Sequence, residues 1–203
     1  MERYEPGTYG DRIADIYDGW HPFLAETTGP TVDLLASLAG GGPVLELAVG
    51  TGRVAIPLAD RGLEVHGIDA SQAMVQRLRA KPGGDKVKVV MGDMADVGVE
   101  GEFSLVFVVF NTFFALLTQD DQLRCFANVA ARLAPSGRFV LECFVPDLKR
   151  FERGQSISVT GVELDRLRLD ASRHHQTEQR VDAQQVVITH EGVRMLPVAL
   201  RYA

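Results

Sequence analysis

Two glycines and two carboxylates stand at spacings that could build a nucleotide pocket. Gly50 and Gly52 close the short apolar run 44–49, and Glu46 lies inside that run. A second apolar run, 65–68, ends in Asp69. Glycines let the backbone approach a ligand closely, and an acid at the tip of the next strand can accept both hydroxyls of a ribose. The spacing therefore predicts a strand, a glycine loop, a helix and a second strand around a nucleoside-like ligand.

Glu46 discriminates between two kinds of cofactor. An anion at this position would repel the pyrophosphate of a nicotinamide dinucleotide, but it suits a cationic ligand such as a sulfonium that also carries an ammonium group. Ala55 replaces the third glycine of the dinucleotide pattern, which that fold tolerates. The chain has no Tyr-x-x-x-Lys proton relay. A sulfonium cofactor is favoured, with an NAD(P)-dependent oxidoreductase of Rossmann type as an alternative.

The elements that must position these residues follow from periodicity. Apolar runs predict five core strands, and amphipathic spacing between them predicts helices. Strands that alternate with helices indicate an α/β fold, a doubly wound Rossmann-like parallel sheet with helices on both faces. The strands are expected at 44–48, 65–68, 87–91, 105–110 and 138–144, and the helices at 11–17, 31–38, 54–60, 72–79 and 120–133, with Pro135-Ser136-Gly137 as a stop before the last strand.

After Pro146 the pattern changes to strands without helices. Segments 156–162, 164–169, 184–189 and 193–202 predict an antiparallel β insert after strand five, with Glu191-Gly192 as a hairpin turn. His174 and His175 are expected in a solvated turn of this insert, with a position facing the acceptor as the alternative. We therefore divide the chain into an N-terminal helical lid (1–42), a cofactor-binding core (43–150) and an antiparallel elaboration (151–203) on the substrate side or at a dimer contact.

Composition excludes several classes of function. The chain has 203 residues and a net charge of −6, and this charge argues against non-specific binding of nucleic acid. The longest apolar stretch, 103–117, is too short to span a bilayer and no secretory leader opens the chain. Cys125 and Cys143 are expected to be buried, reduced thiols, and no metal site is indicated. A cytoplasmic protein with a small-molecule partner, no nucleic-acid partner and no membrane partner is expected.

The motifs in register resemble the class I S-adenosylmethionine (SAM)-dependent methyltransferases. The likeness covers roughly residues 9–144. Glu46 to Gly52, with Leu47, Ala48 and Thr51, resembles the first motif; Asp69, Ala70 and Met74 belong to a segment that resembles the second; and Gly92, Asp93 and Met94 resemble the third. The resemblance implies that Asp69 holds the ribose hydroxyls, that Asp93 accepts from the adenine amino group, and that Phe110 and Asn111 border the methyl group. S-adenosylhomocysteine (SAH) would then be the product.

Within that superfamily the N-terminal segment resembles small-molecule methyltransferases that act on amino sugars and other secondary metabolites. The resemblance implies that Tyr9 and Tyr17 close over the cofactor. Trp20, Asn111 and Phe114 are candidate acceptor-binding residues, and His21 is a weak candidate for a catalytic base. The implied function is methyl transfer to O or N of a small acceptor, with a methyltransferase-like, non-catalytic binding module as the alternative.

The chain departs from the family pattern in two places. Some sugar N-methyltransferases of this group carry a histidine just after strand four, but residues 112–116 contain none. The family also continues past a segment like Arg201-Tyr202 with a final helix and two closing strands. The resemblance therefore implies a shortened chain in which strand five forms an uncovered edge, and a homodimer is expected to cover it.

Overall fold

The computed structural model describes residues 4–20 and 24–202. Its core is a parallel sheet of five strands in the order β3-β2-β1-β4-β5. These strands are β1 (Val44–Leu47), β2 (Val65–Asp69), β3 (Lys88–Met91), β4 (Phe103–Val108) and β5 (Leu133–Leu141). The strand order reverses between β1 and β4, so the connections that leave the carboxyl ends of these two strands run to opposite sides of the sheet. Ligands of doubly wound sheets bind at that switch point.

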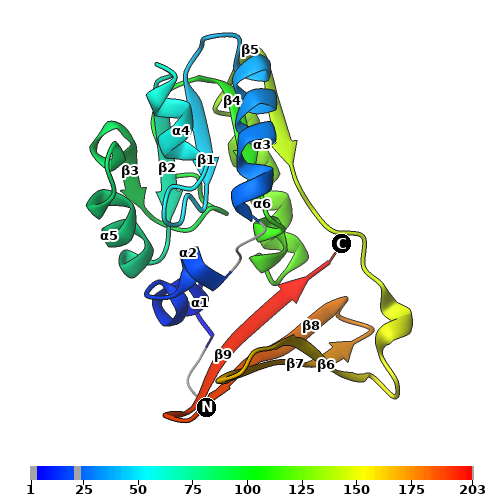
Figure 1. The fold of residues 1–203 in the computed structure, drawn as a ribbon. Coiled ribbons are helices and arrows are strands. Elements are labelled where there is room, and N and C mark those ends of the chain that lie inside the picture. Colours follow the sequence, from blue (N-terminus) through cyan, green and yellow to red (C-terminus); the bar gives the residue numbers. More distant parts are fainter. Residues whose placement is uncertain (1–3, 21–23, 203) are drawn as a thin grey trace.

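Helices cover both faces of the sheet, as Figure 1 shows. Alternation along β1 and β4 sends successive side chains to opposite faces. Val44, Leu105 and Phe107 pack with α3 (Leu24–Ala39), α4 (Ala55–Asp60) and Leu78 of α5 (Gln72–Ala80). Leu45 and Val106 pack on the other face with Cys125 and Val129 of α6 (Gln119–Ala130). The two buried layers hold the carboxyl edge of the sheet rigid, and this edge carries the site. The predicted fold class is confirmed.

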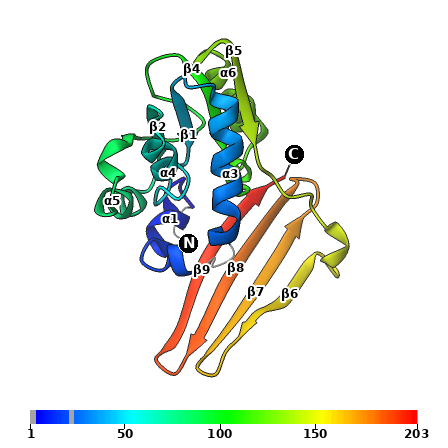
Figure 2. The same ribbon diagram turned by 45° about the horizontal axis from the view of Figure 1, so that its top comes forward.

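Two short helices and a second sheet face that edge. The helices are α1 (Thr8–Ile13) and α2 (Tyr17–Trp20). The second sheet is antiparallel, in the order β6 (Gln155–Val162), β7 (Arg166–His175), β8 (Arg180–Thr189) and β9 (Gly192–Arg201). Figure 2 shows β9 running along the side nearest the core, with α1 beside it. The helices therefore lie between the carboxyl edge of the parallel sheet and the inner face of the antiparallel sheet.

The element bounds differ from prediction where local chemistry overrides periodicity. The helix expected at 31–38 begins at Leu24, with Pro30 inside its first two turns. The stop expected at Pro135-Ser136-Gly137 lies within β5, where the register to β4 shifts and Ser136 adopts a φ of 66°. The predicted turn at Glu191-Gly192 is displaced by one residue, because Thr189 pairs with Gly192 and leaves His190-Glu191 as the loop.

Three further expectations were wrong. Strand five ends at Leu141 rather than Phe144, so Cys143 is exposed, whereas Cys125 is buried as predicted. His174 and His175 belong to β7 and not to a turn. The helix expected at 11–17 is interrupted after Ile13, and Tyr17 begins α2. No helix in the described part of the chain combines the length and hydropathy needed to cross a membrane.

Candidate active site

A cavity of about 280 Å³ lies at the switch point. One wall is the carboxyl edge of the parallel sheet, including Ala48, Gly50 and Asp69. The opposite wall comes from the antiparallel sheet, including Gln185 and Val198. The N-terminal helices and the turn after β4 supply the remaining sides, with Tyr4, Tyr9, Tyr17, Met74, Phe110, Asn111 and Phe144 among the lining residues. The cavity thus brings together residues from the start, the middle and the end of the chain.

Glu46 is buried beneath the glycine loop with one carboxylate oxygen unpartnered. Glu46 is only 4% exposed, and its Oε2 makes no hydrogen bond within the described part of the chain. Burial raises the pKa of this carboxyl to about 8, an effect that the nearby Arg53 guanidinium and a hydrogen bond with the backbone of Ala55 oppose. A buried acceptor without a partner costs about 1–3 kcal/mol, so a hydrogen-bond donor or a cation is expected to reach it.

Asp69 at the tip of β2 is held by two backbone amides. Gly50 N–H donates to Oδ2 over 2.7 Å and Ser71 N–H donates to Oδ1 over 2.8 Å. Burial raises the pKa of Asp69, and the hydrogen bonds from these two backbone amides oppose that rise. Each carboxylate oxygen retains a lone pair, because it accepts one of these bonds and can accept a second. The carboxylate is therefore fixed in orientation and can still accept a pair of ligand hydroxyls.

The backbone is strained on the cavity side of β1 and β4. Ala48, Phe110 and Asn111 have φ angles of 54°, 58° and 65°, in the left-handed region that non-glycine residues rarely adopt. Glu142 holds the turn after β4, since its Oε2 accepts from Phe110 N–H over 2.8 Å and its carbonyl accepts from Asn111 N–H. Such strain costs about 1–3 kcal/mol per residue and concentrates at functional sites. All three strained residues line the cavity.

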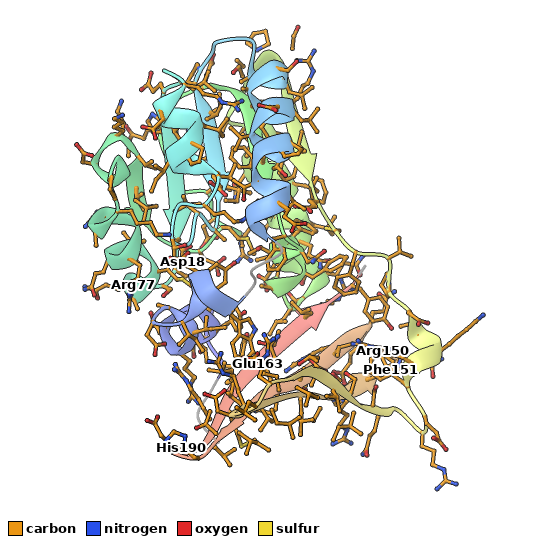
Figure 3. All side chains as sticks on the ribbon, in the orientation of Figure 1. Asp18, Arg77, Arg150, Phe151, Glu163 and His190 are labelled. Atoms are coloured by element: carbon orange, nitrogen blue, oxygen red, sulfur yellow. The ribbon has the colours of Figure 1, made fainter. Side chains whose placement is uncertain are left out.

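Asp18 ties the N-terminal helices to the glycine loop. Thr51 Oγ1 donates to Asp18 Oδ1 over 2.6 Å, and Lys81 Nζ lies 2.8 Å from Asp18 Oδ2. Lys81 also donates to the Thr51 carbonyl over 2.9 Å. A second tie joins α1 to α5, where Ser71 Oγ donates to Asp11 Oδ1 over 2.6 Å. Figure 3 shows Asp18 at the carboxyl edge of the parallel sheet, above the antiparallel sheet that carries Glu163 and His190.

The predicted site residues separate into three groups. Those that line the cavity are Tyr9, Tyr17, Ala48, Gly50, Asp69, Met74, Phe110 and Asn111. Those that belong to β1 or to the loops after β1, β2 and β3 but do not line the cavity are Glu46, Thr51, Gly52, Ala70, Gly92, Asp93 and Met94. Asp93 Oδ1 accepts from Ala95 N–H over 2.9 Å, so this carboxylate also ends a turn.

The other predicted residues lie away from the cavity lining. Leu47 is buried in the core, and Phe114 is buried against Phe144 with ring centroids 5.2 Å apart. Trp20 lines a separate hollow of about 660 Å³, where Arg168 lies 5.7 Å from its ring centroid. His21 falls outside the described residues.

Sequence reasoning missed several residues of the site. Tyr4 lines the cavity, and its hydroxyl accepts from Ala199 N–H over 3.3 Å. Gln185 lines it from β8, in a segment predicted only as a strand. Asp18 and Lys81 are 63 positions apart, and only the fold brings them together. Asp18 directly follows the predicted site residue Tyr17, so its position could have marked it as part of the site. Nothing in the sequence indicated its partner Lys81.

Comparison with known proteins defines the class of this fold and site. A family model described as a methyltransferase domain matches residues 44–137, which include the glycine loop and Asp69. The fold is similar to the structure of the CcbJ methyltransferase from Streptomyces caelestis, with 38% sequence identity and a TM-score of 0.89 over 98% of this chain and 83% of that chain. The chain belongs to the class I SAM-dependent methyltransferases.

Curated relatives point to particular members of that class. The cypemycin N-terminal methyltransferase of a Streptomyces species is 29% identical over 77% of this chain and 64% of its own length. The dTDP-4-amino-2,3,4,6-tetradeoxy-D-glucose N,N-dimethyltransferase of Saccharopolyspora spinosa is 30% identical over 66% of this chain and 55% of its own length. The chain thus spans between about half and two thirds of these two relatives.

Proposed function

We propose that this protein is a SAM-dependent methyltransferase that methylates an amino nitrogen of a small molecule. The observation that carries the proposal is the continuous cavity from Asp69 and the glycine loop to β8 and β9, because cofactor and acceptor must meet in one enclosed space. Two relatives support the choice of an amine, because one is named an N,N-dimethyltransferase and the other an N-terminal methyltransferase.

The residues present fit the cofactor. The unpartnered Oε2 of Glu46 provides a buried acceptor for the ligand's cationic end, and the Asp69 carboxylate can accept from the ribose hydroxyls. Asp93 would accept from the adenine amino group, and Tyr9 and Tyr17 would cover the bound molecule. When bound, SAM supplies a methyl group on a sulfonium, whose departure as a neutral thioether needs no nucleophile from the protein.

The lining of the cavity favours an amine over a hydroxyl acceptor. A hydroxyl must lose its proton to a base as it attacks, whereas a neutral amine attacks with its own lone pair. Among the described lining residues, Asp69 supplies the only carboxylate and none supplies an imidazole. Burial raises the pKa of Tyr17 to about 12 and also raises the pKa values of Tyr4 and Tyr9, so these phenols stay protonated at neutral pH.

Catalysis would therefore rest on alignment and exclusion of water. Holding two reactants in line supplies on the order of 7–11 kcal/mol in well-oriented systems. The strained turn at Phe110 and Asn111 fixes one wall beside the reacting atoms, and the Asp18 tie holds the aromatic helices over the cavity. Nitrogen gains the methyl and the positive charge, and its proton leaves to water after transfer.

Calorimetry and labelled-methyl transfer test this function. Isothermal titration with SAM, SAH and NAD should give binding for the first two and none for NAD, whose binding would favour the oxidoreductase alternative. A screen of amines and alcohols with labelled SAM should label amines. Tight SAM binding with no transfer to any acceptor in the screen would favour the non-catalytic binding module.

We also propose a homodimer formed through the outer face of the antiparallel sheet rather than the edge of β5. Two complete rows across this face are apolar: Val159, Leu169, Val186 and Met195, and Val162, Leu167, Ile188 and Val193. Val159 and Val193 are 61% and 64% exposed, and contiguous apolar faces of this kind mark interaction sites. Light scattering should give twice the chain mass, and Met195→Lys should halve it, whereas the control Leu34→Lys on α3 should leave it unchanged.

A cytoplasmic location completes the proposal. Both cysteines are free, Cys125 buried and Cys143 exposed, and free thiols persist in a reducing compartment. The residues 1–42 would act as a lid, 43–150 as the cofactor-binding core and 151–203 as the acceptor wall and dimer contact.

A further inference from the structure

Gln185 carries a second unpartnered oxygen, on the wall opposite the cofactor residues. Its Oε1 is buried and has no hydrogen-bond partner among residues 4–20 and 24–202, although the residue lines the cavity. In sheet register it lies between Asp170 of β7 and Leu196 of β9. Directly paired residues share one face of a sheet. Leu196 packs on Ile13 and Met74, so this face looks toward α1 and the cofactor side of the cavity.

Asp170 places a carboxylate beside Gln185 on the same face. Cross-strand partners of this kind have Cβ atoms about 5 Å apart. The Asp170 carboxylate accepts a hydrogen bond from Ser172 Oγ, which fixes one of its oxygens. Gln185 Oε1 and the carboxylate oxygens of Asp170 are hydrogen-bond acceptors. The two side chains together therefore match a ligand group that donates and carries positive charge.

Aromatic rings complete that environment. An ammonium is attracted to ring faces by about 0.5–2 kcal/mol per contact. Five aromatic residues of the described chain line the cavity: Tyr4, Tyr9, Tyr17, Phe110 and Phe144. A methylated amine gains a positive charge on transfer, so the same rings suit the product as well as the protonated acceptor.

We propose that Gln185 forms the subsite that binds the amino group of the methyl acceptor, with the Asp170 carboxylate beside it but outside the described cavity lining, an inference that rests on the proposed function. Gln185 Oε1 accepts an N–H of the amine and so sets which way the nitrogen lone pair points. Asp170 favours an acceptor that is cationic before it loses its proton to solvent. An alcohol of the same shape satisfies Gln185 but gains nothing from Asp170.

The chain contains a matched control one residue away. Gln184 also has a buried Oε1 without a partner, but it lines a different hollow on the other side of the sheet, with Arg173 and Ile157. Gln184→Leu and Gln185→Leu thus remove the same group from the same strand. Only the second substitution alters the cavity at the switch point.

The test uses the full chain saturated with SAH, and cyclohexylamine and cyclohexanol as probes. Binding of each probe is followed by ligand-observed NMR, and SAH binding by calorimetry. We expect the wild-type complex to bind the amine more tightly than the alcohol. Gln185→Leu should weaken amine binding about tenfold, as loss of a hydrogen bond to a charged group does, whereas Gln184→Leu should leave it unchanged, and both should bind SAH normally.

A second variant should change amine affinity in the opposite direction, so its effect cannot be attributed to misfolding. Gln185→Glu adds an anion to the subsite and should strengthen amine binding severalfold at pH 7.5, without strengthening binding of the alcohol. Three outcomes would overturn the subsite, provided that SAH still binds. These are no binding of the amine by the wild-type complex, equal binding of the amine and the alcohol, and loss of amine binding to the same extent in both leucine variants. Failure of SAH itself to bind wild type overturns the proposed function, and the subsite with it.

Discussion

Cofactor binding should release a proton from Glu46, and this links affinity to pH. The carboxyl has a pKa of about 8 because it is buried with one oxygen unpartnered. At pH 7 it is therefore protonated in roughly nine molecules of ten. A cationic ligand favours the ionised form, so binding must remove this proton. Removing the proton costs free energy at a pH below the pKa, which weakens binding there. Above the pKa this cost disappears.

The size of the effect follows from the pKa. Between pH 7 and pH 9 the fraction of ionised Glu46 rises about tenfold, so affinity should rise about tenfold, or roughly 1.4 kcal/mol. Stability of the free protein should change in the opposite sense. The folded pKa lies above the ordinary value of 4.5, so the stability that the proton supplies is complete below about pH 4.5 and is lost as pH rises through about 8.

Calorimetry in two buffers measures both the affinity and the proton. Titrations with SAH in phosphate and in Tris, which differ in ionisation enthalpy, should report release of nearly one proton at pH 7 and almost none at pH 9. Glu46→Gln is the control: its remaining pH dependence reports the ligand's own amino group alone. Equal wild-type and Glu46→Gln pH profiles, with no difference in proton release, would refute the assignment of Glu46 as the buried partner of the cation.

Three further predictions address the ribose, the lid and the loop. Asp69→Ala should weaken SAM and SAH binding by about 1.5–3 kcal/mol, as measured by calorimetry on the folded variant, because two charge-assisted hydrogen bonds are lost; unchanged affinity would exclude a ribose contact. Asp18→Asn should speed amide hydrogen exchange across residues 9–20 in the SAH complex, because it removes the charge that pairs with Lys81; exchange as slow as in wild type would show that this tie does not hold the lid. Gly52→Ala should lower the free energy of unfolding by about 1–3 kcal/mol in urea titrations, since φ is +80° and the new Cβ would lie 2.9 Å from Ile56 and Leu78; Gly62→Ala, with a φ of +87° and no atom within 4 Å, should cost less.

The parallel core was predictable because its signals are local. The glycine loop, Asp69 and the apolar run of β4 each carry a pattern that few other structures would satisfy. The run 103–117 was nonetheless predicted to stay extended through Phe110, whereas β4 ends at Val108. Nothing in the apolar run indicates a left-handed φ at Phe110, although asparagine adopts such angles more readily than most residues. Glu142, directly after β5, holds both residues through its hydrogen bonds to their backbone amides.

The opposite wall of the cavity was not predictable for a related reason. Gln185 lies in a segment where polar and apolar residues mix, and its face is set by the pairing of β8 with β7 and β9. The extent of these strands was also underestimated, since β7 runs to His175 and β8 begins at Arg180. A residue becomes part of this wall only when the antiparallel sheet packs against α1. That packing brings α1 into contact with β9, and these two elements lie near opposite ends of the sequence.

Several features that cost stability lie at or next to the cavity. Three non-glycine residues with left-handed backbone and the unpartnered oxygen of Gln185 occur among its lining residues, and the unpartnered oxygen of Glu46 lies under the loop that forms one of its walls. Each of these features destabilises the free protein by on the order of 1 kcal/mol or more. Under the proposed function, Glu46 would gain a partner from a cation and Gln185 from a hydrogen-bond donor. The two oxygens belong to opposite walls, so one ligand at each wall would satisfy both, as expected for a site in which a donor and an acceptor of a methyl group lie side by side.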